Sequence, residues 1–476
     1  MSAYSSSFRT GIQVLRDLKW LGLEWDEGPD NGGSNGPYRQ SERAAAGMYS
    51  SLVDRLLAEN KAYRCFCTDE ELKAMREEQE RRKEPPMYRG KWSSATDAEV
   101  SEAMASGLPY SVRLRVPRPD RKVTLPDLVR GDVTWDTNTL SDFVIMRSNG
   151  LPVYNFCCAI DDAAMGITHV LRAEEHLPNT LKQLLVYEAL EIPHEKWPHF
   201  GHVSLILAPD KSKLSKRHGA TSVGEFASLG YLPSAMANYL CLLGWNDGTE
   251  QELYGVYDEL CDAFSIERIT KSAAVFDRAK LTWMNGQKLR SLDTDAVSAL
   301  IGEQLVAAGV TSDRDSPLSR LAAQILVVDL PSDAEAEVRH ILSYPLAETL
   351  GGAAAAATVA EPSFWEIAKE LDASFASGEL MAAALEEGGE GGGGGGFKAF
   401  IKKIGERTGT KGKKLFMPVR IALTGSMKGP EVGDVVRMVT CAEEEALRLD
   451  GMVGIDARMA QLREARMHHV KETVDV

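Results

Sequence analysis

The chain has 476 residues, of which 44% are hydrophobic and 26% charged, and its formal charge at pH 7 is −15. This composition excludes a wholly disordered or collagen-like chain, and no apolar run in the sequence approaches the roughly 20 residues that a membrane-spanning helix needs. At about 150 residues per domain the length predicts about three domains, and the acidic balance disfavours polyanion binding through bulk charge, although it leaves room for a local basic surface.

The N-terminal segment is predicted to be helical on both sides of one loop. Residues 8–25 have the pattern of an exposed helix that runs into a turn, and residues 26–38 predict a loop because they are dense in Gly, Pro, Asn and Asp. Ser41 is placed to cap a second helix. The apolar residues of that helix recur at helical spacing and therefore share one face: Tyr49, Leu52, Val53 and Leu56.

Strands dominate the pattern in the next part of the chain. Residues 111–116 alternate between apolar side chains and arginines, which predicts a half-buried strand with an arginine face. Residues 143–146 predict another strand. Residues 168–172 are extended, a helical leucine stripe follows, and residues 203–207 form a further apolar run. Strand, helix and strand in this order indicate a parallel βαβ unit.

From about residue 225 onward the pattern is helical. One apolar stripe consists of Phe364, Ile367, Ala368 and Leu371, and Ser363 with Glu366 predicts a capping box at the start of that helix. Residues 386–396, EEGGEGGGGGG, cannot pack a core because they carry almost no apolar side chains, and they predict a flexible linker or loop insertion.

A basic cluster, KSKLSKR, occupies Lys211 to Arg217 and follows the apolar run VSLIL and a short turn. Ligands of α/β sheets bind at the carboxyl ends of the strands, so a lysine-rich loop at this place suits the phosphates of a nucleotide. A solvated surface loop is the alternative, because runs of charge usually face water.

Within this cluster, Lys213–Leu214–Ser215–Lys216–Arg217 resembles the KMSKS element of class I aminoacyl-tRNA synthetases. Its surroundings, ILAPDKSKLSKRHGATSV, resemble glutamyl-tRNA synthetases of the bacterial and organellar type. Seven further segments match that family in order over essentially the whole chain: LKWLGLEWDEGP (18–29), GPYRQSER (36–43), PVYNFCCAIDD (152–162), THVLRAEEHLPNT (168–180), LLGWNDGTE (242–250), VFDRAKLTWMNGQKLR (275–290) and MPVRIALTG (417–425).

The resemblance implies an α/β Rossmann-type class I catalytic domain followed by an all-α anticodon-binding domain. It divides the chain into a remnant of the first half of the catalytic domain (1–62), a connective insertion that binds the tRNA acceptor end (63–150), the second half of the catalytic domain with the KMSKS-like loop (151–225), a helical stem-contact region (226–300) and an α-helical anticodon-binding region (301–476) with a Gly-rich insertion (388–396).

The implied reaction activates glutamate with ATP and then esterifies the 3′ end of tRNA(Glu). Lys216 is expected to contact the ATP phosphates and to stabilise the charge that develops as pyrophosphate leaves, which makes it the catalytic lysine of the loop. Lys213, Leu214, Ser215 and Arg217 are the other expected ATP-binding residues. Mg²⁺ is expected to accompany ATP.

The resemblance also places Arg172 opposite the γ-carboxylate of the substrate glutamate, with Tyr154 in the same pocket. A guanidinium forks onto a carboxylate, and a neutral amide cannot replace that contact, so Arg172 favours glutamate over glutamine. Without the resemblance, Arg172 beside Glu174 and Glu175 fits an internal ion pair equally well, and Tyr154 fits a core aromatic.

Cys65 and Cys67 hint at a metal site, because some members of the family bind zinc at this place. In the family a third cysteine follows shortly afterwards, whereas Trp92 stands at that position here. Two thiols do not make a structural zinc site, which needs four ligands, so no zinc is expected. Seven cysteines, an odd and sparse count, indicate a reduced, intracellular chain without a disulfide framework.

Two other features need an interpretation. His199 and His202, in PHFGHV, imitate the family's HIGH motif, but they are expected to precede a strand rather than to open a helix after one. Lys398 to Arg420 contains eight Lys or Arg residues and one acid, Glu406. This segment is either a solvated face or a tRNA surface, in which Lys413 and Lys414 are the candidate phosphate contacts.

Residue 8 already aligns with the helix that follows the family's first strand, HIGH helix and second strand. The resemblance therefore implies that roughly 50 residues are missing, on the usual size of a βαβ unit, and that activity of the chain as given is doubtful.

The alternatives to a glutamate–tRNA ligase are a glutaminyl-tRNA synthetase and a catalytically inactive tRNA-binding paralogue. The expected partners are tRNA(Glu), with tRNA(Gln) as a second candidate, and glutamate; a monomer without membrane association is expected, in a plastid or mitochondrion or otherwise in the cytoplasm.

Overall fold

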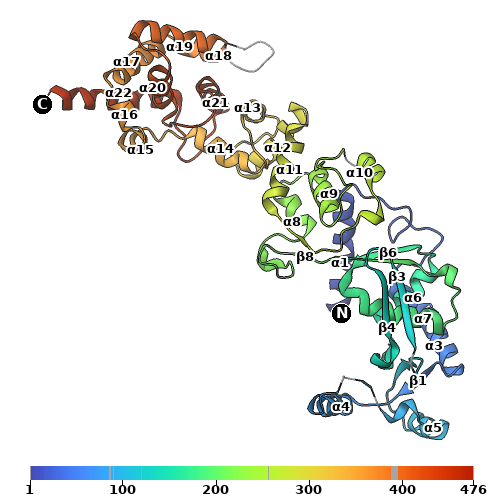
Figure 1. The fold of residues 1–476 in the computed structure, drawn as a ribbon. Helices are drawn as coiled ribbons and strands as arrows, with labels where there is room; N and C mark the ends of the chain where they lie inside the picture. Colours follow the sequence, from blue (N-terminus) through green and yellow to red (C-terminus); the bar gives the residue numbers. More distant parts are fainter. Residues whose placement is uncertain are drawn as a thin grey trace. The chain divides into compact units, whose positions relative to one another are not determined.

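The computed structural model describes residues 2–84, 87–88, 90–119, 121–255, 257–386 and 395–474. The chain forms two compact units. Unit 1 consists of Met1–Thr221 and Ala237–Asp277, and unit 2 of Ser222–Met236 and Arg278–Val476. Unit 1 mixes helices with strands, whereas every described element of unit 2 is a helix (Figure 1). This confirms the predicted fold class, an α/β domain followed by an all-α region.

The strands of unit 1 form four small sheets. They are the antiparallel sheet of β1 (Ala62–Cys65), β2 (Ser111–Leu114) and β5 (Phe143–Met146), the hairpin of β3 (Lys122–Asp127) and β4 (Gly131–Asp136), the parallel pair β6 (His169–Ala173) and β7 (His199–Val203), and the parallel pair β8 (Ile206–Leu207) and β9 (Ala274–Val275).

Unit 1 also contains eight described helices and part of a ninth. They are α1 (Ser2–Trp20), α2 (Gln40–Ala45), α3 (Met48–Ala58), α4 (Asp69–Arg81), α5 (Asp97–Ala105), α6 (Tyr154–Ala164), α7 (Leu177–Ala189) and α10 (Asp258–Ala263), while α9 (Pro233–Leu242) is shared with unit 2. Because α7 connects the parallel strands β6 and β7, the predicted βαβ unit is confirmed, but its second strand is His199–Val203 and not the predicted run 203–207. The apolar stripe of α3 is also confirmed, since Tyr49, Val53 and Leu56 are buried.

Three local predictions in unit 1 are wrong. Ser41 does not cap a helix, because Arg39 occupies the N-cap position of α2, and Gly47 with a φ of 75° separates α2 from α3. His199 and His202 lie within β7 and do not precede it. The predicted arginine face of β2 does not face water, because Arg113 is buried with its guanidinium 4.0 Å from the centre of the Tyr88 ring.

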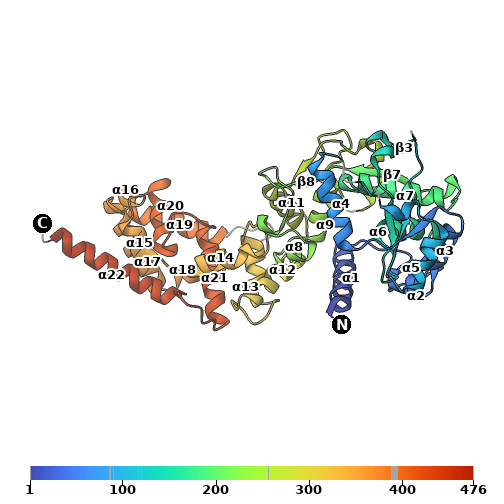
Figure 2. The same ribbon diagram turned by 90° about the horizontal axis from the view of Figure 1, so that it is seen from below.

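Unit 2 packs around one large apolar cluster. Its helices are α8 (Val223–Ser228), α11 (Arg278–Arg290), α12 (Thr294–Ala307), α13 (Pro317–Ile325), α14 (Asp333–Leu342), α15 (Leu346–Gly351), α16 (Ala356–Val359), α17 (Pro362–Ala376), α18 (Glu379–Leu385), α19 (Gly395–Thr408), α20 (Lys413–Thr424), α21 (Val432–Glu444) and α22 (Ile455–Val474). Figure 2 shows α22 along its full length, next to α15 and α17, both of which it contacts.

Helix α17 illustrates both a confirmed pattern and a wrong one. Its predicted stripe lies in the core, since Phe364, Ile367 and Leu371 are fully buried. The predicted capping box of Ser363 and Glu366 is absent from this described helix, because Pro362 begins the helix one residue earlier and leaves Glu361 at the N-cap position. Of the predicted linker, residues 387–394 lie outside the described residues, and Gly395 already belongs to α19.

Candidate active site

Arg172 lies near the end of β6, opposite His202 of the parallel strand β7. Its guanidinium reaches the start of α7, where Nη2 donates hydrogen bonds to Thr180 Oγ1 at 2.6 Å and to Gln183 Oε1 at 2.7 Å. Thr180 and Gln183 are fully buried. The βαβ unit therefore fixes Arg172 at the carboxyl edge of the parallel pair, where α/β folds bind their ligands.

The two glutamates that follow Arg172 are bound to other cations. Glu174 pairs with Arg130 Nη2 at 2.7 Å, and Glu175 pairs with Lys213 Nζ at 2.7 Å. Within the described part of the chain, Arg172 makes no ion pair with a carboxylate. Its hydrogen-bond partners are the neutral or polar side chains of Thr180, Gln183 and His202. The alternative interpretation of Arg172 as half of an internal ion pair is therefore wrong.

Tyr154 begins α6 and is 49% exposed, so it is not a core aromatic. Burial of its hydroxyl raises its pKa, the neighbouring Cys158 thiol raises it further, and the positive charge of Arg172 opposes the rise. The opposing effect of Arg172 indicates that the two side chains lie close together, and their shared role in glutamate binding stays a prediction. The partial exposure of the ring leaves it accessible to a ligand.

Sequence reasoning missed the carboxyl group of Asp162, which lies on α6 near Arg172. Burial raises the pKa of Asp162 to about 6, and the Arg172 charge only partly offsets this rise. Gln183 Nε2 and Asn155 Oδ1 are also buried in this region and have no hydrogen-bond partner within the described residues. The buried part of the site is therefore polar, and it contains a hydrogen-bond donor and an acceptor without partners among the described residues.

The KMSKS-like loop follows β8 and is organised by its own side chains. Asp210 Oδ1 accepts hydrogen bonds from the backbone N–H and the hydroxyl of Ser212, and Ser215 N–H donates to His218 Nδ1 at 3.1 Å. The pair of Lys213 with Glu175 ties this loop to the segment that carries Arg172. The backbone of Lys216 begins the short 3₁₀ helix η5 (Lys216–His218), but its side chain lies outside the described residues.

The neighbourhood of Cys65 and Cys67 contains a tyrosine in place of further metal ligands. The two sulfur atoms lie 3.1 and 3.3 Å from the hydroxyl oxygen of Tyr88. Trp92 is buried, with its ring centre 4.6 Å from that of Phe66. Among the described residues, no group of three or more His, Cys, Asp or Glu side chains is arranged to hold a metal ion. These residues do not fit zinc, and its expected absence stays a prediction.

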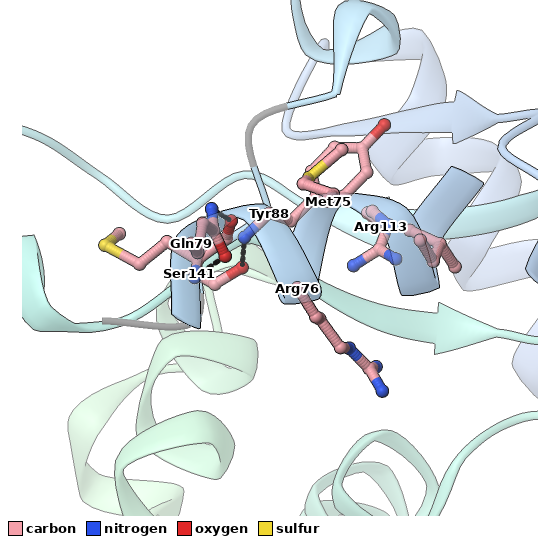
Figure 3. Close-up of a pocket in the computed structure, with 8 residues that line it drawn as sticks. Met75, Arg76, Gln79, Tyr88, Arg113 and Ser141 are labelled. Atoms are coloured by element: carbon pink, nitrogen blue, oxygen red, sulfur yellow. Dashed lines mark hydrogen bonds between the residues drawn. The ribbon is translucent and has the colours of Figure 1, made fainter. Parts of the chain in front are cut away.

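Tyr88 also lines a cavity of about 110 Å³ together with Arg113, Arg76 and Gln79 (Figure 3). The backbone N–H of Tyr88 donates to Ser141 Oγ at 2.8 Å, which fixes the segment after α4 against the sheet. Arg113 Nη1 donates to the Asp142 carbonyl at 3.0 Å. This cavity lies in the predicted connective insertion and belongs to a different part of unit 1 from Arg172.

The basic segment Lys398–Arg420 spans α19 and the first part of α20 in unit 2. Glutamates outside this segment neutralise four of its cations: Lys398 pairs with Glu431, Lys403 and Arg407 with Glu379, and Lys414 with Glu361. By contrast, Lys402, Lys411 and Lys413 have no ion pair with any described residue. Phe416 is 56% exposed near them. The two predicted tRNA contacts therefore differ, because only Lys413 keeps an unpaired charge in the described structure.

Comparison with known proteins agrees with this geometry. The family model of the catalytic domain of class I tRNA synthetases (E and Q) matches residues 9–283, and a model of an anticodon binding domain matches residues 395–448. The glutamate–tRNA ligase of Carboxydothermus hydrogenoformans is 40% identical over 443 residues, which are 92% of this chain and 88% of that protein. The enzyme of Heliobacterium modesticaldum is 39% identical over 464 residues, 96% of this chain and 88% of that protein.

Two solved structures are also similar. A glutamate tRNA ligase from Elizabethkingia meningosepticum, crystallised in complex with its amino acid, has a TM-score of 0.78 and 28% identity, with 95% of this chain and 88% of that chain covered. Glutamate-tRNA synthetase from Elizabethkingia anophelis has a TM-score of 0.78 and 29% identity over the same shares. With a catalytic-domain match over more than half of its length and about 40% identity to the ligases of Carboxydothermus and Heliobacterium, the chain belongs to the glutamate–tRNA ligase family of class I tRNA synthetases.

Proposed function

We propose that this protein ligates glutamate to tRNA(Glu) through a glutamyl-adenylate. The observation that carries the proposal is the state of Arg172, whose guanidinium is held by Thr180 and Gln183 while Glu174 and Glu175 are bound elsewhere. A cation in a polar site without a carboxylate partner of its own is suited to receive a carboxylate from the substrate.

The same arrangement supports selection of glutamate over glutamine. A carboxylate accepts hydrogen bonds from the guanidinium at both oxygens, whereas an amide presents one acceptor and one donor to an all-donor group. Sites that bind a specific polar group reject an analogue without it by large factors, since their own polar groups are then left unpaired. Tyr154, beside Arg172, is proposed to line the same pocket.

In the activation step, the α-carboxylate of glutamate attacks the α-phosphorus of ATP and pyrophosphate leaves. We assign Lys213–Arg217 to ATP binding and Lys216 to the stabilisation of the charge that builds up on the leaving group. The pairing of Lys213 with Glu175 supports this assignment, because it holds the loop beside the Arg172 segment. Mg²⁺ is proposed to enter with the nucleotide, since this ion is commonly held by substrate phosphates rather than by a protein cage.

In the transfer step, the 3′ end of the tRNA accepts the glutamyl group. We propose that residues 63–150 bind the acceptor end and that the helical unit 2 binds the anticodon region, with Lys413 as one phosphate contact. The anticodon-domain match over residues 395–448 supports the second assignment, because it includes the basic segment. tRNA(Gln) is a second candidate acceptor.

The test is aminoacylation by the full-length protein with labelled glutamate or glutamine and transcripts of tRNA(Glu) and tRNA(Gln). The proposal predicts glutamate on tRNA(Glu), with glutamine used far less efficiently. Preferential use of glutamine would favour a glutaminyl-tRNA synthetase. Tight tRNA binding without ATP–pyrophosphate exchange, measured with tRNA present, would favour the non-catalytic paralogue.

The resemblance to organellar members further leads us to propose that the protein works in a plastid or mitochondrion, as a monomer. Among the described residues, no helix combines the length and apolar character needed to cross a bilayer. Imaging of a fluorescent fusion of the full-length protein tests the location, and sedimentation equilibrium tests the monomer.

A further inference from the structure

Arg172 is connected to a buried carboxylate through the side chains of Thr180 and His202, and its Nε also donates directly to His202 Nε2 at 3.5 Å. Thr180 Oγ1, which accepts from Arg172, lies 2.9 Å from His202 Nε2, and His202 Nδ1 lies 2.5 Å from Asp127 Oδ2. Thr180, His202 and Asp127 are all buried, the first two completely. Asp127 ends strand β3 and therefore belongs to the hairpin β3–β4, in the predicted connective insertion, and not to the βαβ unit that carries Arg172.

Asp127 is an ionised acceptor at the end of this chain of hydrogen bonds. Its Oδ1 accepts from the backbone N–H groups of Val129, Arg130 and His202 at 2.8–3.1 Å. Burial alone would raise the pKa of Asp127, but these backbone bonds and the contact with the His202 ring lower it. A carboxylate that remains ionised accepts hydrogen bonds and donates none, so the Asp127 oxygen requires a proton on His202 Nδ1.

The direction of the remaining hydrogen bonds follows from that proton. Burial lowers the pKa of His202 and keeps the ring neutral, so Nε2 carries no proton and acts as an acceptor. The Thr180 hydroxyl then donates to His202 Nε2 at 2.9 Å, which lies closer than its other acceptor, the His176 carbonyl at 3.2 Å, and it accepts from Arg172 Nη2. Every donor points the same way, from Arg172 through Thr180 and His202 to Asp127, and such aligned chains polarise one another.

We propose, on the basis of the proposed glutamate–tRNA ligase function, that Asp127, His202 and Thr180 are positioning residues that aim Arg172 at the side-chain carboxylate of the substrate. Asp127 compensates the charge of Arg172 without touching it. A direct carboxylate partner would occupy the guanidinium. The hydrogen-bonded chain of Thr180, His202 and Asp127, here called the relay, instead orients the guanidinium and leaves it able to bind a ligand. The hairpin of the insertion thereby takes part in the choice of amino acid.

Arg130 strengthens this arrangement from the same hairpin. Besides holding Glu174, its Nε donates to the His202 carbonyl at 3.1 Å and its Nη2 donates to Ser204 Oγ at 2.7 Å. Leu128 N–H donates to the Phe200 carbonyl at 2.8 Å, which places the end of β3 beside β7. One short segment, residues 127–130, thus supplies the terminal carboxylate of the relay and holds Glu174 in an ion pair with Arg130.

The test compares two substitutions at Thr180 in the full-length enzyme. Thr180→Val removes the hydroxyl at nearly constant volume, whereas Thr180→Ser retains it. We expect Thr180→Val to raise the KM for glutamate about tenfold or more, because a buried donor loses its partner, with the KM for ATP nearly unchanged and with weaker discrimination against glutamine. Thr180→Ser should restore the wild-type values within about threefold, as the retained hydroxyl implies.

The second comparison is Asp127→Asn, with Asp132→Asn as its matched control on the exposed part of the same hairpin. An amide at position 127 presents a donor to His202 and favours a proton on Nε2, which reverses the relay. Asp127→Asn should therefore reproduce the rise in KM for glutamate, and Asp132→Asn should not.

The inference is overturned if folded Thr180→Val enzyme keeps its KM for glutamate and its discrimination against glutamine within twofold of wild type. It is also overturned if the KM for glutamate and the KM for ATP rise equally in that variant. Failure of the wild-type enzyme to charge glutamate at all would instead reject the proposed function, and this inference with it.

Discussion

In two regions of the molecule, the ion pairs differ from what the order of the charges along the sequence suggests. Arg172 is followed directly by two glutamates, yet both bind other residues, and Arg172 stays without a carboxylate partner among the described residues. The basic segment Lys398–Arg420 contains one acid, yet four of its cations are paired with glutamates outside the segment. Distance along the chain therefore does not decide which charges remain available to a ligand.

The largest effect is expected at the loop that is tied to the Arg172 segment. Lys216→Ala should lower the rate of ATP–pyrophosphate exchange by the full-length protein about 100- to 1,000-fold, since a preorganised charge in the transition state is lost. Folding, followed by thermal unfolding, should change little. A reduction of less than threefold would remove Lys216 from the chemistry and leave only the solvated-loop interpretation.

A smaller effect should separate two adjacent lysines of the basic segment. Lys413→Glu should weaken tRNA binding about tenfold at low salt and flatten the salt dependence of the affinity, because an unpaired cation near phosphates is lost. Lys414→Glu should weaken it less, since Lys414 already pairs with Glu361. Filter binding over a range of salt concentrations measures both. Equal effects of the two substitutions would contradict the prediction that an unpaired cation contributes more to tRNA binding than a paired one.

Arg407 offers a still smaller effect within the same segment. Its guanidinium is bound to Glu379 at 2.9 Å, so Arg407→Gln should leave the tRNA affinity and its salt slope within about twofold of wild type. A loss as large as that of Lys413→Glu would show that pairing in the free protein does not predict which cations meet tRNA.

No effect is expected from metal chelation. Tyr88 and Trp92 fill the space around Cys65 and Cys67, so dialysis against a chelator should not change the unfolding temperature. Purified protein should contain far less than one zinc ion per chain. Near-stoichiometric zinc that disappears in Cys65→Ser would contradict this expectation.

Local patterns predicted much of what the structure contains. The order of strand, helix and strand around α7 was readable, as was the apolar stripe of α17, because both depend on short-range periodicity. The places of Arg172 and of the KMSKS-like loop at strand ends follow from the same patterns. The first residues of helices were harder to predict. Helix α17 begins at Pro362, one residue before the predicted capping box of Ser363 and Glu366.

The long-range contacts that hold the site residues in place were not predictable from the sequence. Asp127 and His202 are separated by 75 residues, and nothing in either local pattern marks them as a pair. The same holds for Lys414 and Glu361, which are separated by 53 residues. Such partners are set by tertiary packing, so a single sequence shows which residues carry charge but not which charges are already compensated.

The most direct test of the account is calorimetric titration of glutamate into the full-length protein, with a non-hydrolysable ATP analogue and tRNA present. Wild-type protein and Glu174→Gln should bind glutamate and should bind glutamine far more weakly, because Glu174 is engaged with Arg130 and not with Arg172. Arg172→Gln should lose glutamate binding by about 100-fold or more, as removal of a charge-assisted partner implies. Undiminished glutamate binding by Arg172→Gln, or equal binding of glutamate and glutamine by the wild type, would contradict the account.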